Sequence, residues 1–305
     1  MTRRDIKNVA ASVHARLLNE AKASRRPFNE LLQYYAMERF LYRLSQSPHT
    51  ERFVLKGALL LRTHYVHLAR PTRDIDLLGH GSSRIERLIQ IVQECLHLDV
   101  PDDGMYFDPE SVQGKEISQQ AAYQGARIQF AGRLGNARTP MQLDVGFGDA
   151  IEPGPIWVEY PELLDFGAPR LLGYTLESAI AEKFQALVHL GLTNSRMKDF
   201  YDLWLLAQHF RFEGERLAQA IQTTFEGRNT ALPAHPPEAL TGAFTENPDK
   251  QQRWRVFLRK ARLQTKGASL KTVMEQIDAF LMPPTVALVE GNLFTMIWPP
   301  GGPWQ

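Results

Sequence analysis

Two aspartates set one residue apart in an apolar segment constrain the fold of this chain more than any other feature. In residues 70–78, Asp74 and Asp76 alternate with Ile75 and Leu77. Strand side chains alternate between faces, so both carboxylates point the same way, roughly 6.5 to 7 Å apart along the backbone. Like charges this close are costly without a cation between them, and oxygen ligands suit Mg²⁺, or Mn²⁺ in its place. The pair predicts a metal site on a short buried strand.

A glycine turn precedes that strand. Residues 53–61 are predicted to form a strand end, a turn at Gly57 and the start of a helix, with Lys56 and Ala58 on either side of the glycine. Small residues let backbone N–H groups approach a phosphate at a helix N-terminus. Taken alone, such a turn is more often a glycine that serves helix packing.

The Lys-Gly turn and the run Arg-Pro-Thr-Arg-Asp-Ile-Asp at residues 70–76 together resemble the AbiEii/AbiGii toxin family and its mycobacterial MenT relatives, over roughly residues 50 to 210. The resemblance implies an α+β fold with a nucleotidyltransferase (polymerase beta-like) core and a mixed sheet. In that family the glycine turn holds the triphosphate and the aspartate pair holds magnesium. Ala58 replaces the usual Ser, Thr or second Gly, so a hydroxyl contact to the nucleotide is missing. The implied metal ligands are Asp74 and Asp76, and the implied nucleotide contacts are Lys56, Gly57, Ala58 and Thr72.

A third carboxylate is predicted on a hairpin. Residues 126–132 and 139–149 are expected to be two strands joined by a turn at 134–137. Apolar residues occupy alternate positions of the second strand, and Asp144 lies on the other face. Asp144 can therefore project toward the Asp74 and Asp76 edge as a catalytic base or further metal ligand. The alternative is a polar residue on a strand face that meets solvent.

Lys183 lies on the apolar stripe of the helix predicted over residues 175–188, together with Ile180, Phe184 and Leu187. A buried ammonium needs an anionic partner. By the resemblance, that partner is the phosphates of the nucleotide, in an Ala-Glu-Lys context. The alternative is a lysine that extends its amine to the edge of the helix.

The helix predicted over residues 195–206 carries Asp199 and Asp202 one turn apart. The family has an R-x-K-D-x-Y-D-L-like signature here, which implies that Asp199 completes the active site and that Arg196, Lys198 and Asp202 contact the nucleotide. Asp144 and Asp199 both remain candidates for activating the attacking hydroxyl. The alternative is an acid that complements the helix dipole, a contribution of about 0.3 to 1 kcal/mol.

Composition favours a globular enzyme, since 44% of the 305 residues are hydrophobic and 23% are charged. Cys95 is the one cysteine, so neither a disulfide framework nor a zinc cluster can form, and its helical apolar neighbours predict a packed thiol. No apolar run reaches the ~18 residues that span a bilayer. We expect a cytoplasmic protein without a membrane partner.

Four regions are predicted along the chain. They are a helical extension (1–48), the nucleotidyltransferase core (49–168), a helical region that completes the active site (169–232) and a basic helical region with a Pro/Gly-rich tail (233–305). Within them we expect a helix over residues 84–98, a loop from Pro101 to Glu110, a linker from Asn229 to Pro237 and an extended tail from Pro283.

The net charge of +1 indicates no partner by itself, but the distribution of the basic residues along the chain does. Eight basic residues and no acidic residue lie between Lys250 and Lys271. Arg255, Arg259 and Arg262 are predicted on one helical face, as in nucleic-acid-binding surfaces. A solvated helix face is the alternative. A second basic set could extend the surface: Arg3, Arg4, Lys7, Arg16, Lys22, Arg25 and Arg26.

The resemblance implies the toxin of a toxin–antitoxin or phage-defence pair, with a cognate antitoxin. It would transfer a nucleoside monophosphate from an NTP to an RNA 3′ hydroxyl, such as the acceptor end of tRNA, and so block translation. Three alternatives stay open at this point. They are an antibiotic-modifying nucleotidyltransferase, a phosphotransferase-type toxin and a non-catalytic RNA-binding regulator.

Overall fold

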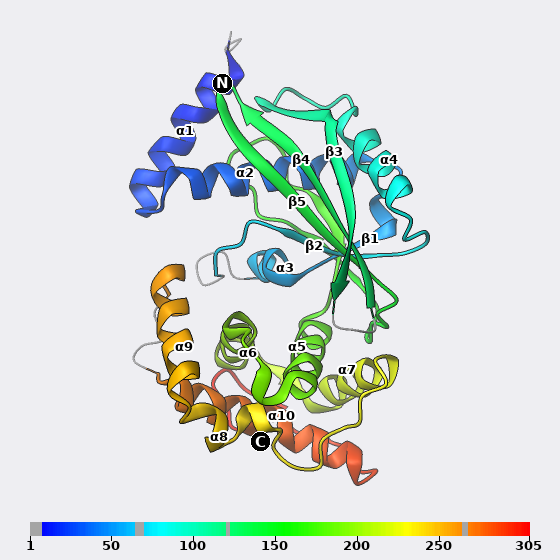
Figure 1. Ribbon diagram of the computed structural model, residues 1–305, viewed down its shortest axis with the longest axis vertical. Coiled ribbons are helices and arrows are strands. Elements are labelled where there is room, and N and C mark those ends of the chain that lie inside the picture. Colours follow the sequence, from blue (N-terminus) through cyan, green and yellow to red (C-terminus); the bar gives the residue numbers. More distant parts are fainter. Residues whose placement is uncertain (1–7, 65–69, 120–122, 264–267) are drawn as a thin grey trace. The chain divides into compact units, whose positions relative to one another are not determined.

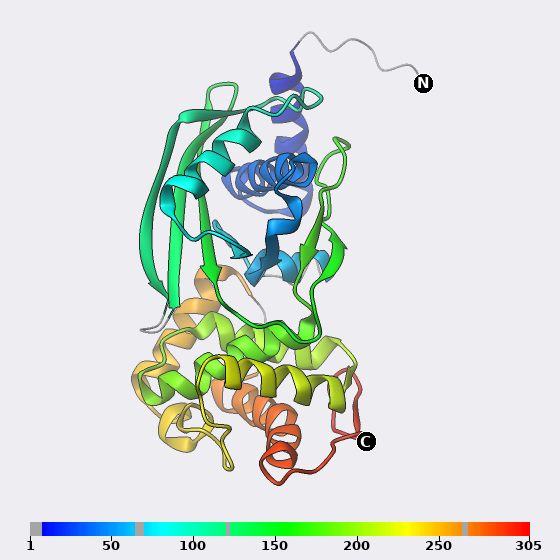
Figure 2. The same ribbon diagram turned by 90° about the vertical axis from the view of Figure 1, so that its right-hand side faces the viewer.

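The computed structural model describes residues 8–64, 70–119, 123–263 and 268–305, and divides the chain into two compact units (Figures 1 and 2). Unit 1 comprises residues 1–148 and 156–173, and unit 2 comprises residues 149–155 and 174–305. The chain therefore passes between the units three times. The basic residues Arg3, Arg4, Lys7 and Lys266 lie outside the described residues.

Unit 1 is built on a seven-stranded sheet in the order β3-β4-β5-β2-β1-β7-β6. The strand pairs β2–β5 and β1–β7 are parallel and the others are antiparallel, which confirms the predicted mixed sheet. The strands are β1 (Phe53–Lys56), β2 (Ile75–Gly79), β3 (Met105–Gln119), β4 (Tyr123–Leu134), β5 (Ala137–Phe147), β6 (Ile156–Glu159) and β7 (Arg170–Gly173).

Helices α2 and α4 pack on one face of this sheet. Phe40 of α2 contacts Phe130 of β4, and a Cβ at Gly114 of β3 would meet Ile85 and Ile89 of α4. Ile128 and Phe130 of β4 point to this covered face, so Arg127 and its alternate neighbours point to the opposite one. The helices of unit 1 are α1 (Val9–Ser24), α2 (Phe28–Gln46), the short η1 (Thr50–Arg52), α3 (Gly57–His64) and α4 (Ile85–Leu96).

Local sequence signals explain most of these elements. Asn8 caps α1 by accepting a hydrogen bond from the N–H of Ala11. The β4–β5 hairpin turns at Gly135, whose φ is +56°, as the predicted hairpin requires. Cys95 is buried in α4, and burial raises the pKa of its thiol to about 11, which confirms a packed cysteine.

The loop predicted from Pro101 to Glu110 is wrong, because β3 begins at Met105. The turn ends at Gly104, which has a φ of +75°, and the alternation of buried Met105 and Phe107 with exposed Tyr106 then follows strand periodicity. Pro109 is tolerated where the β3–β4 register shifts between Asp108 and Gln113.

Unit 2 is mainly helical, and three of its long helices begin at a side-chain cap. Thr175, Asn247 and Ser269 accept hydrogen bonds from the first turns of α5, α9 and α10. The elements are α5 (Leu176–Leu190), η2 (Gly191–Thr193), α6 (Met197–His209), β8 (Phe212–Glu213), α7 (Gly214–Gly227), η3 (Glu238–Leu240), α8 (Gly242–Thr245), α9 (Pro248–Ala261), α10 (Leu270–Val289) and β9 (Ile297–Trp298).

The extended tail begins later than predicted, because α10 continues through Pro283 and Pro284 to Val289. Proline removes helix hydrogen bonds. Here Leu281, Met282 and Thr285 around the prolines are buried, so packing stabilises the last turns of the helix.

Beyond α10 the tail binds back to the core of unit 2. The indole N–H of Trp298 donates to the carbonyl of Ala207 at 2.7 Å, and that of Trp304 donates to the carbonyl of Phe280 at 3.0 Å. The segment from Asn229 to Pro237 holds no helix or strand, and its role as a linker stays a prediction. Among the described residues, no helix is both long and apolar enough to cross a membrane.

Candidate active site

Three carboxylates meet on the face of the unit 1 sheet opposite the one on which α2 and α4 pack. Asp76 of β2 lies directly opposite Asp144 of the parallel strand β5, and Asp74 lies just before β2. One oxygen of each of the three carboxylates lies within 4.8 Å of the others. An all-oxygen set of this kind fits a hard divalent cation such as Mg²⁺, and these three side chains are the ones that would hold it.

The acids belong to a row of charged residues that runs across five strands. Residues directly opposite each other on paired strands share one face. In order from β3 to β1, this charged row consists of Lys115, Arg127, Asp144, Asp76 and Lys56. Basic side chains thus stand on both sides of the acids, and Lys56 is buried.

Arg127 binds Asp144 through two parallel hydrogen bonds. Its Nε donates to Oδ1 at 2.8 Å and its Nη2 donates to Oδ2 at 2.7 Å. The bond to Asp144 raises the pKa of Arg127, and Asp74 and Asp76 act in the same direction. Sequence reasoning assigned Arg127 no role. The signal was available, because a hairpin that pairs Leu134 with Ala137 must also place Arg127 opposite Asp144.

Gly57 brings the start of α3 against the acids. Its φ is +69°, and a Cβ built there would lie 2.1 Å from Oδ2 of Asp76. Glycine is therefore required both by backbone conformation and by space. Lys56, Gly57 and Ala58 lie where strand β1 turns into α3, and Ala58 is buried.

Thr72 contacts Asp74, the first acid of the pair. Its hydroxyl donates to Oδ1 of Asp74 at 2.9 Å, and the backbone N–H of Arg73 donates to the same oxygen at 3.1 Å. These two bonds hold the Asp74 carboxylate in place from the loop that precedes β2. The contact of Thr72 with nucleotide stays a prediction.

A second cluster lies inside unit 2. Lys183 of α5 contacts both aspartates of α6, with its Nζ 2.8 Å from Oδ1 of Asp199 and 2.9 Å from Oδ2 of Asp202. The side chain of Asp202 is fully buried, so the positive charge of Lys183 offsets the cost of removing this carboxylate from water. Lys183 thus has anionic partners within the protein itself. Arg196 and Lys198, at the start of α6, are exposed.

The predicted site residues therefore form two groups, each within one unit. Neither the metal roles nor the nucleotide contacts are tested by this geometry, and they stay predictions. The group in unit 1 is Lys56, Gly57, Ala58, Thr72, Asp74, Asp76 and Asp144, and the group in unit 2 is Lys183, Arg196, Lys198, Asp199 and Asp202.

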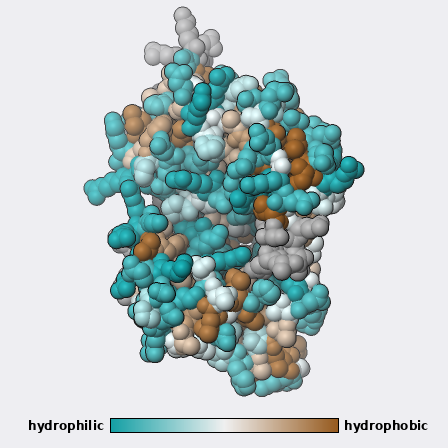
Figure 3. All heavy atoms as spheres, viewed as in Figure 1, coloured by the Kyte–Doolittle hydropathy of each residue, from teal (hydrophilic) through white to brown (hydrophobic). Residues whose placement is uncertain are grey.

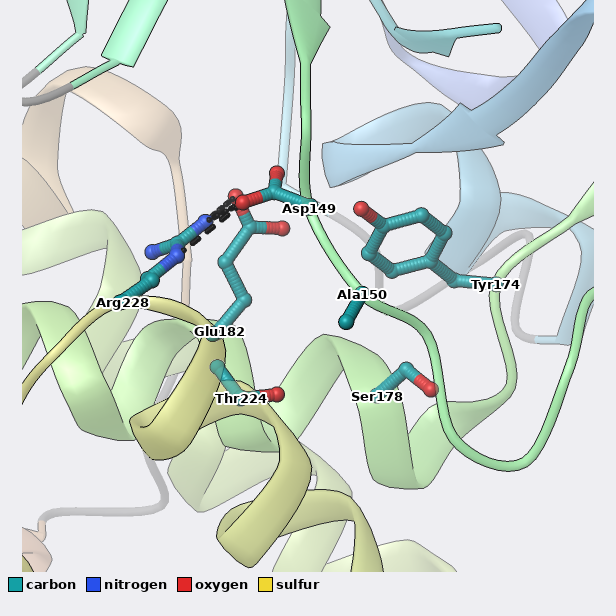
Figure 4. Close-up of a pocket in the computed structure, with 8 residues that line it drawn as sticks. Asp149, Ala150, Tyr174, Ser178, Glu182, Thr224 and Arg228 are labelled. Carbon is teal, nitrogen blue, oxygen red and sulfur yellow. Dashed lines mark hydrogen bonds and ion pairs between the residues drawn. The ribbon is translucent and has the colours of Figure 1, made fainter.

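A further ion network in unit 2 was missed by sequence reasoning. Arg228, just after α7, contacts Asp149 at 2.8 Å and Glu182 of α5 at 2.9 Å, and donates to the side chain of Gln185 at 2.9 Å. Figure 4 shows these carboxylates converging on the guanidinium beside a small pocket. Since Asp149 follows β5 by two residues, this network fixes the chain immediately after the strand that carries Asp144.

The mixed sheet and the three carboxylates beside a glycine turn are the features that the sequence resemblance to nucleotidyltransferases implies. A family model described as "Nucleotidyl transferase AbiEii toxin, Type IV TA system" matches residues 39–280. The chain belongs to this family, which confirms the resemblance found in the sequence. Family membership implies a nucleotide substrate and an antitoxin partner.

Two solved structures from Helicobacter pylori are similar to this chain. One is of a candidate nucleotidyltransferase, with 16% identity and a TM-score of 0.48 over 86% of this chain and 96% of that chain. The other is of the protein JHP933, with 17% identity and a TM-score of 0.44 over 83% of this chain and 90% of that chain. No curated protein matches the chain.

Proposed function

We propose that this nucleotidyltransferase uses Mg²⁺ to transfer a nucleoside monophosphate from an NTP to the 3′ hydroxyl of an RNA, the acceptor end of tRNA being the specific candidate. Modified acceptor ends would block translation in the cytoplasm, in a toxin–antitoxin or phage-defence role. The observation that supports the proposal most is the approach of three carboxylates to within 4.8 Å beside Gly57. A bound divalent cation would offset their charge and that of the triphosphate.

The proposed reaction is one displacement at the α-phosphorus. The oxygen of the acceptor hydroxyl forms a bond to the α-phosphorus, and the bond from that phosphorus to the oxygen bridging it to the β-phosphorus breaks. Pyrophosphate leaves with the bonding electrons. We assign the hydroxyl proton to Asp144 in preference to Asp199, because Asp144 lies opposite Asp76 on the next strand.

The glycine turn and two lysines are proposed to receive the nucleotide. Backbone N–H groups at the start of α3 carry partial positive charge, which favours phosphate there. Lys56 adds a positive charge at the adjoining strand end. In unit 2 we propose that Lys183 contacts phosphate while it remains paired with Asp199 and Asp202, together with Arg196 and Lys198.

The proposal is tested by following a label from the phosphates of the NTP into RNA. NTPs labelled at the α- or the γ-phosphate are incubated with the full chain, Mg²⁺ and bulk tRNA, and the label in RNA is counted. We expect transfer of the α label, with release of pyrophosphate. Transfer of the γ label would instead identify a phosphotransferase, one of the alternatives left open by the sequence.

Asp76→Asn removes one anionic ligand while it keeps the shape of the side chain. We expect this variant to lose the transfer of the α label and to fold normally, as monitored by circular dichroism. Glu159→Gln, on the exposed edge strand β6, serves as the matched control and should retain activity. Full activity of the Asp76 variant would refute the metal site.

A further inference from the structure

Arg127 binds the third carboxylate in a specific geometry that the proposed reaction leaves unexplained. A carboxylate offers about four lone-pair sites, two on each oxygen. Arg127 occupies one site on each oxygen of Asp144 through its two parallel bonds of 2.8 and 2.7 Å. The carboxylate is therefore fixed in one plane, yet each oxygen retains a site for another partner.

The charge of Arg127 matters as much as its geometry. Three carboxylates within 4.8 Å repel one another, and the charged row places a cation on each side of them, Lys56 from β1 and Arg127 from β4. The side chain of Arg127 is 31% exposed, whereas that of Asp144 is 8% exposed. Arg127 thus stands at the edge of the acid cluster and offsets part of its charge in the absence of a metal.

We propose that Arg127 is a positioning residue for the transfer reaction. It holds the Asp144 carboxylate so that the remaining lone pairs face Asp74 and Asp76, where they can accept from the acceptor hydroxyl or bind the cation. This inference rests on the proposed function of the acid cluster. An ion pair that only stabilises the β4–β5 hairpin is the competing explanation.

Three variants separate charge, geometry and fold. Arg127→Gln removes the charge, and Arg127→Lys keeps the charge but cannot form two parallel N–H bonds from one planar group. Arg133→Gln is the matched control, because Arg133 lies on the same face of β4 and contacts Tyr106 instead of an acid. For each, Mn²⁺ binding to the full chain is titrated by electron paramagnetic resonance, and α-label transfer and thermal unfolding are measured.

We expect Arg127→Gln to bind Mn²⁺ roughly threefold to tenfold more tightly, because a competing cation has been removed. Its turnover should fall about 10- to 100-fold, as for other residues that orient metal ligands. Arg127→Lys should keep the Mn²⁺ affinity of the natural protein within about twofold and still lose turnover. A purely structural ion pair predicts a lower unfolding temperature with Mn²⁺ affinity unchanged, and that result would overturn the inference.

A double variant tests whether Arg127 acts through Asp144. If it does, adding Arg127→Gln to Asp144→Asn should cause no further loss of turnover, because the residue it positions is already disabled. A further full loss in the double variant would contradict the inference. The two proposals also fail differently. If Asp76→Asn retains transfer of the α label, the proposed function is refuted. If Asp76→Asn loses transfer but the single variant Arg127→Gln behaves like the control Arg133→Gln, only the positioning role is refuted.

Discussion

At the scale of single residues, Gly57 links backbone geometry directly to the acid cluster. The backbone there is left-handed, which disfavours any side chain, and a Cβ would lie only 2.1 Å from Oδ2 of Asp76. We predict that Gly57→Ala displaces the Asp76 carboxylate and abolishes transfer of the α label, while stability falls by about 1 to 2 kcal/mol or more from the left-handed conformation. Activity is measured by the labelling assay and stability by urea unfolding.

Gly81 provides the control for this substitution. It also has a positive φ, +97°, but a Cβ there meets nothing within 4 Å. Gly81→Ala should therefore show the backbone cost without the loss of activity. Equal activity in the two alanine variants would show that the approach of Gly57 to Asp76 is irrelevant to the reaction.

At the scale of elements, α9 is the candidate RNA-binding surface. Arg255 and Arg259 are exposed one turn apart, and the one buried residue of this helix is Trp254. The prediction that Arg262 shares their helical face is wrong, because Arg262 adopts a left-handed conformation (φ +54°) at the C-cap. Of the three arginines predicted on one helical face, Arg255 and Arg259 therefore lie within α9, and Arg262 lies beyond its end.

We predict that replacing Arg255 and Arg259 with Gln weakens RNA binding to the same extent whatever the sequence of the RNA. The slope of log affinity against log salt should decrease by about 0.7 to 0.9 per phosphate contact, hence by nearly two units. Binding is measured by fluorescence anisotropy at several salt concentrations. Gln at the exposed Arg84 and Arg138 of unit 1 is the control pair. An unchanged slope would mean that these arginines of α9 face solvent and do not contact RNA.

Helix α2 carries the clearest source of pH dependence. Burial raises the pKa of Glu38 from its usual 4.5 to about 7, although Arg39 and the N–H of Leu163 oppose that shift. Below about pH 4.5 both folded and unfolded chains hold the proton. Between pH 4.5 and 7 the unfolded chain loses it first, so stability falls with rising pH, by on the order of 3 kcal/mol in total.

Glu38→Gln should remove most of this decline, since the amide resembles the protonated acid. The unfolding temperature of the natural protein should drop between pH 5 and pH 7, and that of the variant should stay flatter. Glu159→Gln is again the exposed control. Parallel curves for the natural protein and the Glu38 variant would contradict the assignment.

At the scale of the whole molecule, the two units have separate cores. A destabilising substitution in one unit should therefore not unfold the other. Lys183→Met removes one ion-pair partner of the buried Asp202, and breaking a buried ion pair typically costs about 3 to 5 kcal/mol. We predict faster hydrogen exchange in peptides of unit 2 and unchanged exchange in unit 1. Exposed Lys198→Met is the control, and Asp202→Asn should partly rescue the Lys183 variant. Faster exchange throughout both units would contradict the prediction.

Much of the fold could be predicted from the sequence because its signals are local. The alternation around Asp74 and Asp76, the hairpin that carries Asp144 and the helical stripes of α5 and α6 all depend on nearest neighbours. The sequence did not reveal which partners meet across strands or helices. Arg127 was missed because its role depends on strand register. The pairing of Lys183 with Asp199 and Asp202 was missed because those aspartates lie on another helix, and the contact of Lys183 with phosphate stays a prediction.

Two further differences have the same origin. Strand β3 was missed because Pro109 and the acids of that segment resemble a loop, yet pairing with β4 supplies the stability that its local sequence lacks. The prolines of α10 predicted an end to the helix, but the burial of their neighbours outweighs the lost hydrogen bonds. In both places tertiary contacts override local propensity.

The burial of the single thiol makes this chain convenient for spectroscopic labelling. Because Cys95 is fully buried and its pKa is raised to about 11, it forms little thiolate at neutral pH and should resist maleimide dyes. Cysteines introduced at exposed positions of the two units, such as Arg133 and Lys260, would then be the reactive ones. A donor and acceptor dye at these positions would report, molecule by molecule, whether NTP changes the distance between the units.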